Sequence, residues 1–485
     1  MKTAILGSFV LSIWHSILFW NKNWGVSMSL FFIPITLFLV YVLNKSKKVK
    51  DKKACTLIIP IILLSFTYML FDNKSFAVIN IIAILGLIAI MSIWLTAGDL
   101  KLKLLISKIF SVLFGPIELF GESGKKIKDL FQTEQNNGKI LKKIVKTILI
   151  TIPIALIVLY LLMSADTIFA DSFGWIASYL KSLFVDYEII YFLLRIVIIF
   201  ILGIYFLSYI INLIGEHTSY SVSEEVNKRK EHKIDIFTIN TVLTILNIIY
   251  FIFSIIQFVY LFIGIEKGAN FDYAQYARQG FFQLLFVSFI NFILLFICNG
   301  CTKNLNKYTK WMNVLMAIFT GVIIVSSFFR MHLYQQEYGY TYLRLAVDFI
   351  LLTEMVLLVP IIIYITKKKI HLVKVCFTII LTMYIIANYA NFDYLIAKKN
   401  IDNYFKNEQE NEIDLAYLKY NTGFDAMDEI TRLLKTNNNQ VKEAARTYLI
   451  KQKKLLESQE STWQEYNYSK ERARKILSNI ENETI

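Results

Sequence analysis

The sequence has few of the prolines, glycines and cysteines that disulfide-rich, fibrous or loop-rich proteins need. Five prolines and eighteen glycines in 485 residues are too few for a collagen-like or proline-rich chain. The short alternating strands of an outer-membrane barrel are also absent. A disulfide framework is excluded because all four cysteines lie in or beside apolar segments, at Cys55, Cys298, Cys301 and Cys376. Only Cys298 and Cys301 have a metal-like spacing, and no further ligand follows closely, so we expect no metal.

Charge is scarce as well. Charged residues make up 18% of the chain and hydrophobic residues 56%, against about 25% and 45–50% in soluble domains. The apolar residues form uninterrupted blocks near the ~20 residues that a membrane-spanning helix needs. The sequence therefore predicts an all-α polytopic membrane protein with about eleven spans: Ala4–Trp20, Val26–Leu43, Ala54–Phe71, Ser75–Ala97, Ile144–Met163, Ile189–Ile214, Ile236–Ile265, Phe281–Cys298, Trp311–Phe329, Leu345–Thr366 and Leu372–Ala390.

The connections between these blocks alternate between basic and nearly charge-free. One set carries 28 Lys and Arg and the opposite set 7. By the positive-inside rule the basic set is cytoplasmic, which places the N-terminus inside and the C-terminal tail outside a bacterial cytoplasmic membrane. The first block follows Lys2 and has no small-residue cleavage site after it, so we interpret it as a retained helix rather than a signal peptide.

Four segments follow from this topology: a four-helix membrane segment (1–98), a basic cytoplasmic connector (99–143), a seven-helix membrane core (144–391) and a soluble helical tail (392–485). From Lys398 onward the tail has no net charge, so the formal charge of +14 belongs to the part of the chain before it. A basic excess on cytoplasmic loops favours attraction to the bilayer's anionic lipids, and we expect no nucleic-acid partner.

The connector and the tail each allow two interpretations. Leu100–Phe114 has a lysine face and an apolar face, which predicts an interfacial amphipathic helix ended by Gly115-Pro116; it is either a lipid-sensing lever or a plain connector. The tail either binds an envelope protein or caps the membrane domain. Helical periodicity in it predicts helices over Asp425–Leu434, Val441–Leu456 and Ser461–Ile480.

Charged residues inside spans are costly and are functional candidates by default. Glu188, Tyr191 and Arg195 share one helix face, which predicts a stripe into the bundle that either joins two helices or binds a substrate. Asp348 lies one turn after Arg344 and can pair with it. Glu354 is deeper and on another face, and it either carries a proton or is simply buried neutral.

Two segments on the predicted external side concentrate arginine and tyrosine. We expect Arg278, Arg330 and Arg344 to converge on an anionic ligand, with tyrosines at the rim, because arginine forks suit carboxylate or phosphate. The alternative is that each arginine meets a local carboxylate or a lipid headgroup. The tyrosines of this hypothesis are Tyr276, Tyr334 and Tyr338.

The same two segments carry a family resemblance. The run Tyr273–Leu284, with Leu333-Tyr334, Tyr338–Thr341 and Arg344, resembles the bacterial multi-pass family known as domain of unknown function 4173, related to 4153. Gln279, Gln283 and Tyr340 replace that family's usual basic residue, acid and leucine. The resemblance spans about 146–434, and it supports the architecture but implies no activity.

No Walker loop, kinase motif set, H-E-x-x-H or G-x-S-x-G is present, so we expect no enzyme and no cofactor. The leading hypothesis is a non-catalytic envelope sensor or regulatory protein that handles an anionic ligand. The alternative is a secondary transporter or lipid flippase, favoured by the intramembrane charges.

Overall fold

The structure is a computed structural model that describes residues 1–98, 102–132, 187–215, 235–262, 273–300, 306–367, 370–406, 408, 412–459 and 462–480. Within these ranges every regular element is a helix, and ten helices are long and apolar enough to cross a membrane. The all-α polytopic class is therefore confirmed. Ten of the eleven expected spans coincide with these helices, and the remaining one, Ile144–Met163, lies outside the described residues.

Contacts divide the chain into two compact units. The first comprises Met1–Leu57 and Gly86–Ser221, and the second Ile58–Leu85 and Val222–Ile485. Helix α4 (Lys74–Ala97) contributes to both. The other helices of the first unit are α1 (Lys2–Phe19), α2 (Val26–Lys45), η1 (Lys52–Leu57), α5 (Leu102–Glu118), α6 (Phe120–Gln132) and α10 (Tyr187–Ile214). Those of the second unit before the tail are α3 (Ile58–Leu70), α12 (Ile236–Phe262), α13 (Tyr273–Gly300), α14 (Lys307–Tyr338), α15 (Tyr342–Lys367) and α16 (Leu372–Tyr389).

The long helices bury small polar side chains and expose large apolar ones. On α14, Thr320 and Ser327 are fully buried, whereas Ile318 and Phe328 are 51% and 46% exposed. Hydrocarbon solvates such apolar side chains, and small polar residues let neighbouring helices approach closely. This distribution is the one expected of helices that pack together inside a bilayer.

In the first unit, α5 corrects one expectation from the sequence. The helix does not end at Gly115-Pro116 but continues to Glu118. A proline removes only one backbone donor, and Asn212 of α10 supports the same turn by donating to the Ser111 carbonyl at 3.1 Å. The bend instead falls between α5 and α6, which meet at 55°. The interfacial position of this segment stays a prediction.

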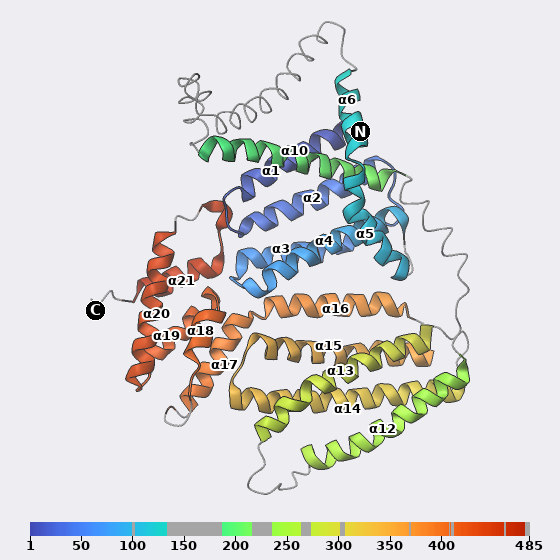
Figure 1. The fold of residues 1–485 in the computed structure, drawn as a ribbon, viewed down its shortest axis with the longest axis vertical. Coiled ribbons are helices and arrows are strands. Elements are labelled where there is room, and N and C mark those ends of the chain that lie inside the picture. Colours follow the sequence, from blue (N-terminus) through green and yellow to red (C-terminus); the bar gives the residue numbers. More distant parts are fainter. Residues whose placement is uncertain are drawn as a thin grey trace, which may run out of the picture. The chain divides into compact units, whose positions relative to one another are not determined.

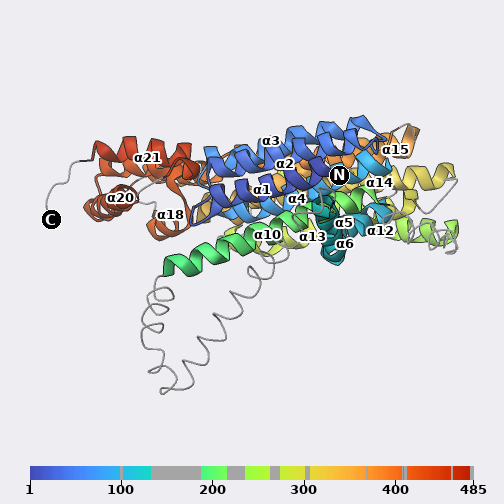
Figure 2. The ribbon, with the colours of Figure 1, turned by 90° about the horizontal axis from the view of Figure 1, so that it is seen from above.

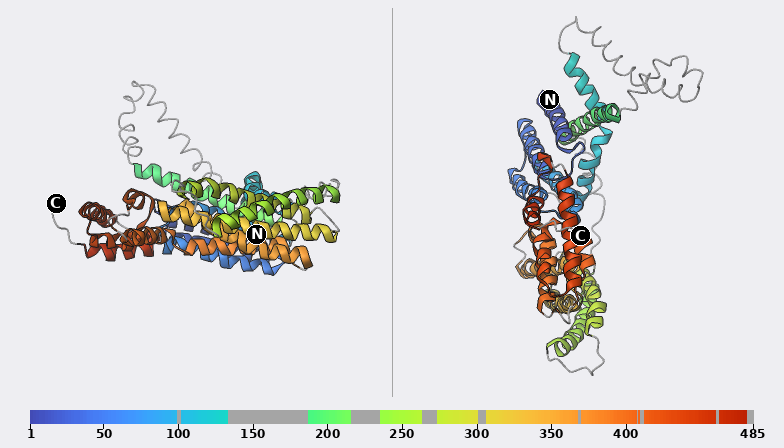
Figure 3. Two further views of the ribbon diagram at one scale, coloured as in Figure 1. Left: turned by 90° about the horizontal axis from the view of Figure 1, so that it is seen from below. Right: turned by 90° about the vertical axis from the view of Figure 1, so that its left-hand side faces the viewer.

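In the second unit, helices α12 to α16 lie side by side (Figure 1), with α14 in contact with α12, α13 and α15. The tail helices, coloured red, lie at one end of this group (Figure 3). This is the end where α14 ends and α15 begins (Figure 1), and we call it the tail-side end. Two hydrogen bonds fix this arrangement. The backbone N–H of Tyr340 donates to Asn400 Oδ1 at 2.6 Å, and that of Tyr342 to Tyr417 Oη at 2.9 Å.

The tail is helical, as predicted, but its helices are more numerous than expected. They are α17 (Phe392–Lys406), α18 (Leu415–Asn421), η3 (Phe424–Ala426), α19 (Met427–Arg432), η4 (Leu433–Lys435), α20 (Asn439–Ser458), η5 (Trp463–Glu465) and α21 (Tyr468–Ser478). Together they enclose an apolar core that includes Ile396, Leu433, Leu449 and Leu477; α18, α20 and α21 are grouped in Figure 2. The last helix begins at Tyr468 rather than Ser461, because Asn467 caps it by accepting from the N–H of Lys470.

Candidate functional site

A pocket of about 320 Å³ lies at the tail-side end of the second unit. It forms where α13 begins, α14 ends and α15 begins, so both of the arginine- and tyrosine-rich segments contribute to it. The lining is mainly aromatic and apolar, and Arg344 brings a positive charge to it. The lining residues are Phe281, Phe282, Met331, Tyr334, Thr341, Leu343 and Arg344.

Arg344 is held in place by the end of α14. Its guanidinium lies over the Tyr334 ring, 4.2 Å from the ring centre, and its Nη1 donates to the carbonyls of Tyr338, at 2.7 Å, and Gly339. These carbonyls follow the last turn of α14, where helix carbonyls lose their intrahelical partners, and Gly339 turns the chain with a positive φ of 77°. Within the described part of the chain no carboxylate forms an ion pair with Arg344.

The expected pair between Arg344 and Asp348 is therefore wrong. Asp348 Oδ2 instead accepts from Gln335 Nε2 of α14 at 2.5 Å. The guanidinium turns toward the carbonyls that precede α15, whereas Asp348 lies one turn further along that helix. Asp348 therefore does not neutralise the positive charge of Arg344, which remains in the lining of the pocket.

Arg330 has a different role from Arg344. Its side chain is only 6% exposed, its Nη2 donates to Gln257 Oε1 at 3.1 Å, and it does not line the pocket. The guanidinium packs against Gly280 of the first motif segment, where a β-carbon would stand 1.8 Å from Nη1. The prediction that all three arginines share one pocket thus fails for Arg330.

The remaining residues of this hypothesis are only partly described. The side chains of Tyr276 and Arg278 lie outside the described residues. Tyr338 is 49% exposed, and its ring packs on that of Tyr334 with centres 5.1 Å apart. Of the predicted tyrosines, Tyr334 is the one that the structure places in the pocket lining.

Glu354 lies among buried polar groups between α13, α14 and α15. It is 6% exposed, and Ser288 Oγ donates to its Oε2 at 2.6 Å. Nearby on α13, Asn291 bonds Thr320 at 3.0 Å and Tyr250 at 2.7 Å. Glu354 and Asp348 make separate contacts, as their different helix faces predict.

In the first unit, Arg195 connects two helices. Its Nε donates to Ser16 Oγ of α1 at 2.6 Å, which supports the helix-joining interpretation. Tyr191 is 49% exposed and so does not point into the bundle, contrary to the expected stripe. The side chain of Glu188 lies outside the described residues.

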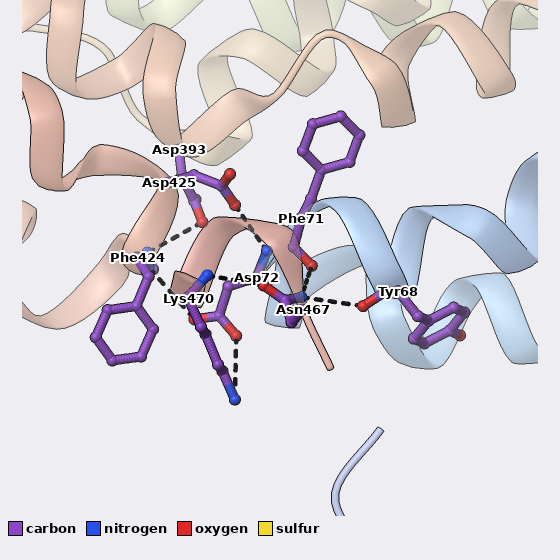
Figure 4. Close-up of polar contacts among 9 residues, drawn as sticks. Tyr68, Phe71, Asp72, Asp393, Phe424, Asp425, Asn467 and Lys470 are labelled. Carbon is purple, nitrogen blue, oxygen red and sulfur yellow. Dashed lines mark hydrogen bonds and ion pairs between the residues drawn. The ribbon is translucent and has the colours of Figure 1, made fainter. Parts of the chain in front are cut away.

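Sequence reasoning missed a cluster of three carboxylates at the tail-side end (Figure 4), which comes from three distant segments. Asp72 lies in the turn between α3 and α4, Asp393 in the first turn of α17, and Asp425 in η3. Backbone N–H groups hold all three: Gly423 donates to Asp393 at 3.0 Å, Phe424 to Asp72 at 3.3 Å, and Asp72 to Asp425 at 2.7 Å. No signal in the sequence links residues so far apart.

Asp393 is the most enclosed of the three, at 1% exposure. Burial, together with the neighbouring charges of Asp425 and Asp72, raises its pKa to about 8. Burial also raises the pKa of Asp72 and of Asp425, and Lys470, 4.0 Å from Asp72, partly opposes this. Burial and the mutual repulsion of the carboxylates therefore favour the protonated form in this cluster.

Asn467 joins the tail to the end of α3 beside this cluster. Its side-chain amide donates to the carbonyls of Tyr68, at 3.0 Å, and Phe71, at 2.9 Å. Among the described residues no group of three His, Cys, Asp or Glu side chains has the geometry to hold a metal ion. The carboxylate cluster is thus a polar junction between the α3–α4 turn and the tail.

Comparisons with known proteins agree with this architecture. A family model described as a domain of unknown function (DUF4153) matches residues 58–433. No curated protein and no solved structure matches the chain. The match is to the second of the two related families that the motif segments resemble, and it covers most of the chain. The chain therefore belongs to the DUF4153 family of domains of unknown function.

Proposed function

We propose that this is a non-catalytic protein of the bacterial cytoplasmic membrane that binds an anionic amphiphile in the tail-side pocket. The amphiphile carries a phosphate or carboxylate group and an apolar part. The N-terminus is cytoplasmic and the tail extracytoplasmic, as the distribution of lysine and arginine indicates. The observation that carries the proposal is a pocket of about 320 Å³ whose aromatic and apolar walls hold Arg344.

The apolar walls of the pocket and the positive charge of Arg344 suit two different parts of one ligand. Phe281, Phe282 and Leu343 offer apolar surface to an acyl or similar chain. Arg344 offers a planar guanidinium that is already oriented by Tyr334 and by two backbone carbonyls. A preorganised guanidinium loses little side-chain entropy on binding, and its contacts with phosphate or carboxylate are among the stronger polar interactions.

Direct binding to the full-length protein tests this proposal. The protein in nanodiscs of neutral lipid would be titrated with phosphatidylglycerol and, separately, with inorganic phosphate, and bound species counted by native mass spectrometry. Binding of phosphatidylglycerol alone identifies a lipid ligand, and binding of phosphate identifies a headgroup-sized ion.

Variants connect the binding to the pocket. Arg344→Gln is expected to weaken binding at least tenfold, since a charge-assisted contact is worth about 1.5–3 kcal/mol. Arg474→Gln, which changes an arginine beside Glu471 on the tail, is the matched control and is expected to bind normally. Equal binding by the wild type and Arg344→Gln, or no binding of either ligand to the wild type, would overturn the proposal.

A secondary transporter or flippase is a second candidate, and Glu354 is the observation that favours it. An ionisable group enclosed within spans and bonded to Ser288 is an arrangement that proton-coupled carriers use. The test is lipid scrambling or solute uptake in proteoliposomes. Activity that a folded Glu354→Gln protein loses would place this candidate first, and absence of activity in the wild type would remove it.

A further inference from the structure

The cluster of Asp72, Asp393 and Asp425 joins parts of the chain that are far apart in sequence. Asp72 belongs to the α3–α4 turn, and the other two belong to the tail. Gly423 lies at its centre: a β-carbon there would stand 2.4 Å from the Asp72 carbonyl oxygen and 3.0 Å from Asp393 Oδ2. The tail therefore docks on the turn through closely packed carboxylates and backbone N–H groups (Figure 4).

Asp393 accepts fewer hydrogen bonds than Asp425. Its Oδ2 accepts from the N–H of Gly423, whereas its Oδ1 is buried and has no hydrogen-bond partner among the described residues. Asp425, by contrast, accepts from Asn391 at its Oδ1 and from the Asp72 N–H at its Oδ2. A buried carboxyl group that has few hydrogen-bond donors is more stable neutral than ionised, because nothing compensates the loss of water around its charge.

The charged and titratable groups around Asp393 do not supply a full counter-charge. Lys470 reaches Asp72 at 4.0 Å, with the two side chains 25% and 15% exposed, and Lys74 at the start of α4 acts at longer range. The groups that interact with the cluster from the elements packed around it are Asp72, Lys74, Asp425, Lys470, Tyr417 of α18 and Tyr448 of α20.

We propose that Asp393 is a proton-binding site, and that the proton strengthens the docking of the tail on the α3–α4 turn. The tail is then held more firmly at acidic pH than at alkaline pH. This inference concerns the tail junction and stands independently of the ligand in the pocket.

The direction follows from the two states of Asp393. In the docked tail its pKa is about 8, and in an undocked, hydrated tail it returns to its ordinary value of 3.8. Docking is therefore strongest below pH 4, weakens as the pH rises toward 8, and reaches its minimum above that value. Between pH 6 and pH 9 the docking constant is expected to fall about tenfold or more.

Hydrogen–deuterium exchange on the full-length protein in nanodiscs tests the proposal. The amides of Asp72 and Phe424 donate across the junction, so their protection, corrected for intrinsic exchange, reports docking. In the wild type we expect the protection to be about tenfold greater or more at pH 6 than at pH 9. Equal protection at both values in the wild type would overturn the proposal, whatever any variant does.

Two substitutions assign the effect to Asp393. Asp393→Asn still offers an oxygen to Gly423 but cannot ionise, so its protection is expected to be nearly independent of pH. Asp428→Asn changes an exposed acid that pairs with Arg472 on the same tail, and it is expected to behave as the wild type. A folded Asp393→Asn protein that keeps the wild-type pH dependence would contradict the assignment.

Discussion

The guanidinium of Arg330 packs directly on the α-carbon of Gly280, so that one residue of the second motif segment occupies the space that a side chain on the first would need. Arg330 is almost fully buried there and donates to Gln257, which also accepts from Ser326 at 2.6 Å. The two motif segments therefore pack tightly against each other at this point, in addition to lining the pocket.

Gly280→Ala should destabilise the second unit. The added methyl would stand 1.8 Å from Arg330 Nη1, and moving the guanidinium would break its bond to Gln257. Overpacking of this kind costs about 1–3 kcal/mol. Thermal unfolding of the purified protein is the measurement. Gly86→Ala, where nothing lies within 4 Å of the new methyl, is the control and should unfold at or above the wild-type temperature.

Gln257→Leu should be more damaging than Gly280→Ala. It removes the acceptor of both Arg330 and Ser326 from a buried position, and each buried donor that loses its acceptor costs about 1–3 kcal/mol, more where the donor is charged. The expected result is a larger drop in unfolding temperature than that of Gly280→Ala. An unfolding temperature close to the wild-type value would mean that Gln257 does not stabilise Arg330.

Tyr334→Leu should weaken ligand binding while leaving Arg344 charged. The substitution keeps an apolar wall but removes the ring that lies 4.2 Å from the guanidinium carbon. Loss of a cation–π contact of about 0.5–2 kcal/mol predicts a roughly 2- to 30-fold weaker affinity for the anionic probe. Tyr334→Phe keeps the ring and should bind normally; an equal loss in both variants would assign the effect to the hydroxyl group.

Asp72→Asn should move the pH dependence of tail docking to lower pH. The charge of Asp72 is one of the causes that raise the pKa of Asp393, so its removal lets Asp393 ionise earlier as the pH rises. Exchange of the backbone amide of residue 72, which donates to Asp425 across the junction, between pH 5 and pH 9 would locate the midpoint. A midpoint that moved upward would show that Asp72 acts on Asp393 through something other than its charge.

Asn467→Ala should loosen the tail at every pH. It removes two hydrogen bonds to the end of α3 and the cap of α21, at a cost of about 2–4 kcal/mol for three bonds of about 1 kcal/mol each. Faster proteolysis within 463–478 is the expected readout. Asn438→Ala removes only the cap of α20, so it should cost about 1 kcal/mol and leave the α3 junction intact.

The spans were predictable because hydrocarbon imposes a length and a polarity on each helix separately. A run such as Leu345–Thr366 indicates a span without reference to any neighbour, and α15 contains it. The position of Arg344 beside tyrosines in the pocket lining was predictable for a similar reason, since a tyrosine-rich segment and an arginine lie close together in the sequence. Its partner was not, because Asp348 and the carbonyls of Tyr338 and Gly339 compete for one guanidinium.

The carboxylate junction depends instead on contacts that composition cannot express. Asp72 and Asp425 look like ordinary polar residues in connections, and 353 residues separate them. These acids form a buried cluster only because α17 and η3 pack on the α3–α4 turn. The burial of Arg330 was missed likewise, since its space is provided by Gly280, on a different helix.

The bonds from Asn467 to the end of α3 also concern the order in which the protein is made. Their partners, Tyr68 and Phe71, precede Asn467 by 399 and 396 residues. At roughly 5–20 residues per second, the ribosome reaches Asn467 about 20–80 s after it has passed α3. During that interval these two carbonyls lack the side-chain amide of Asn467 as a partner. The second unit therefore completes the end of α3 with a residue that is synthesised nearly 400 positions later.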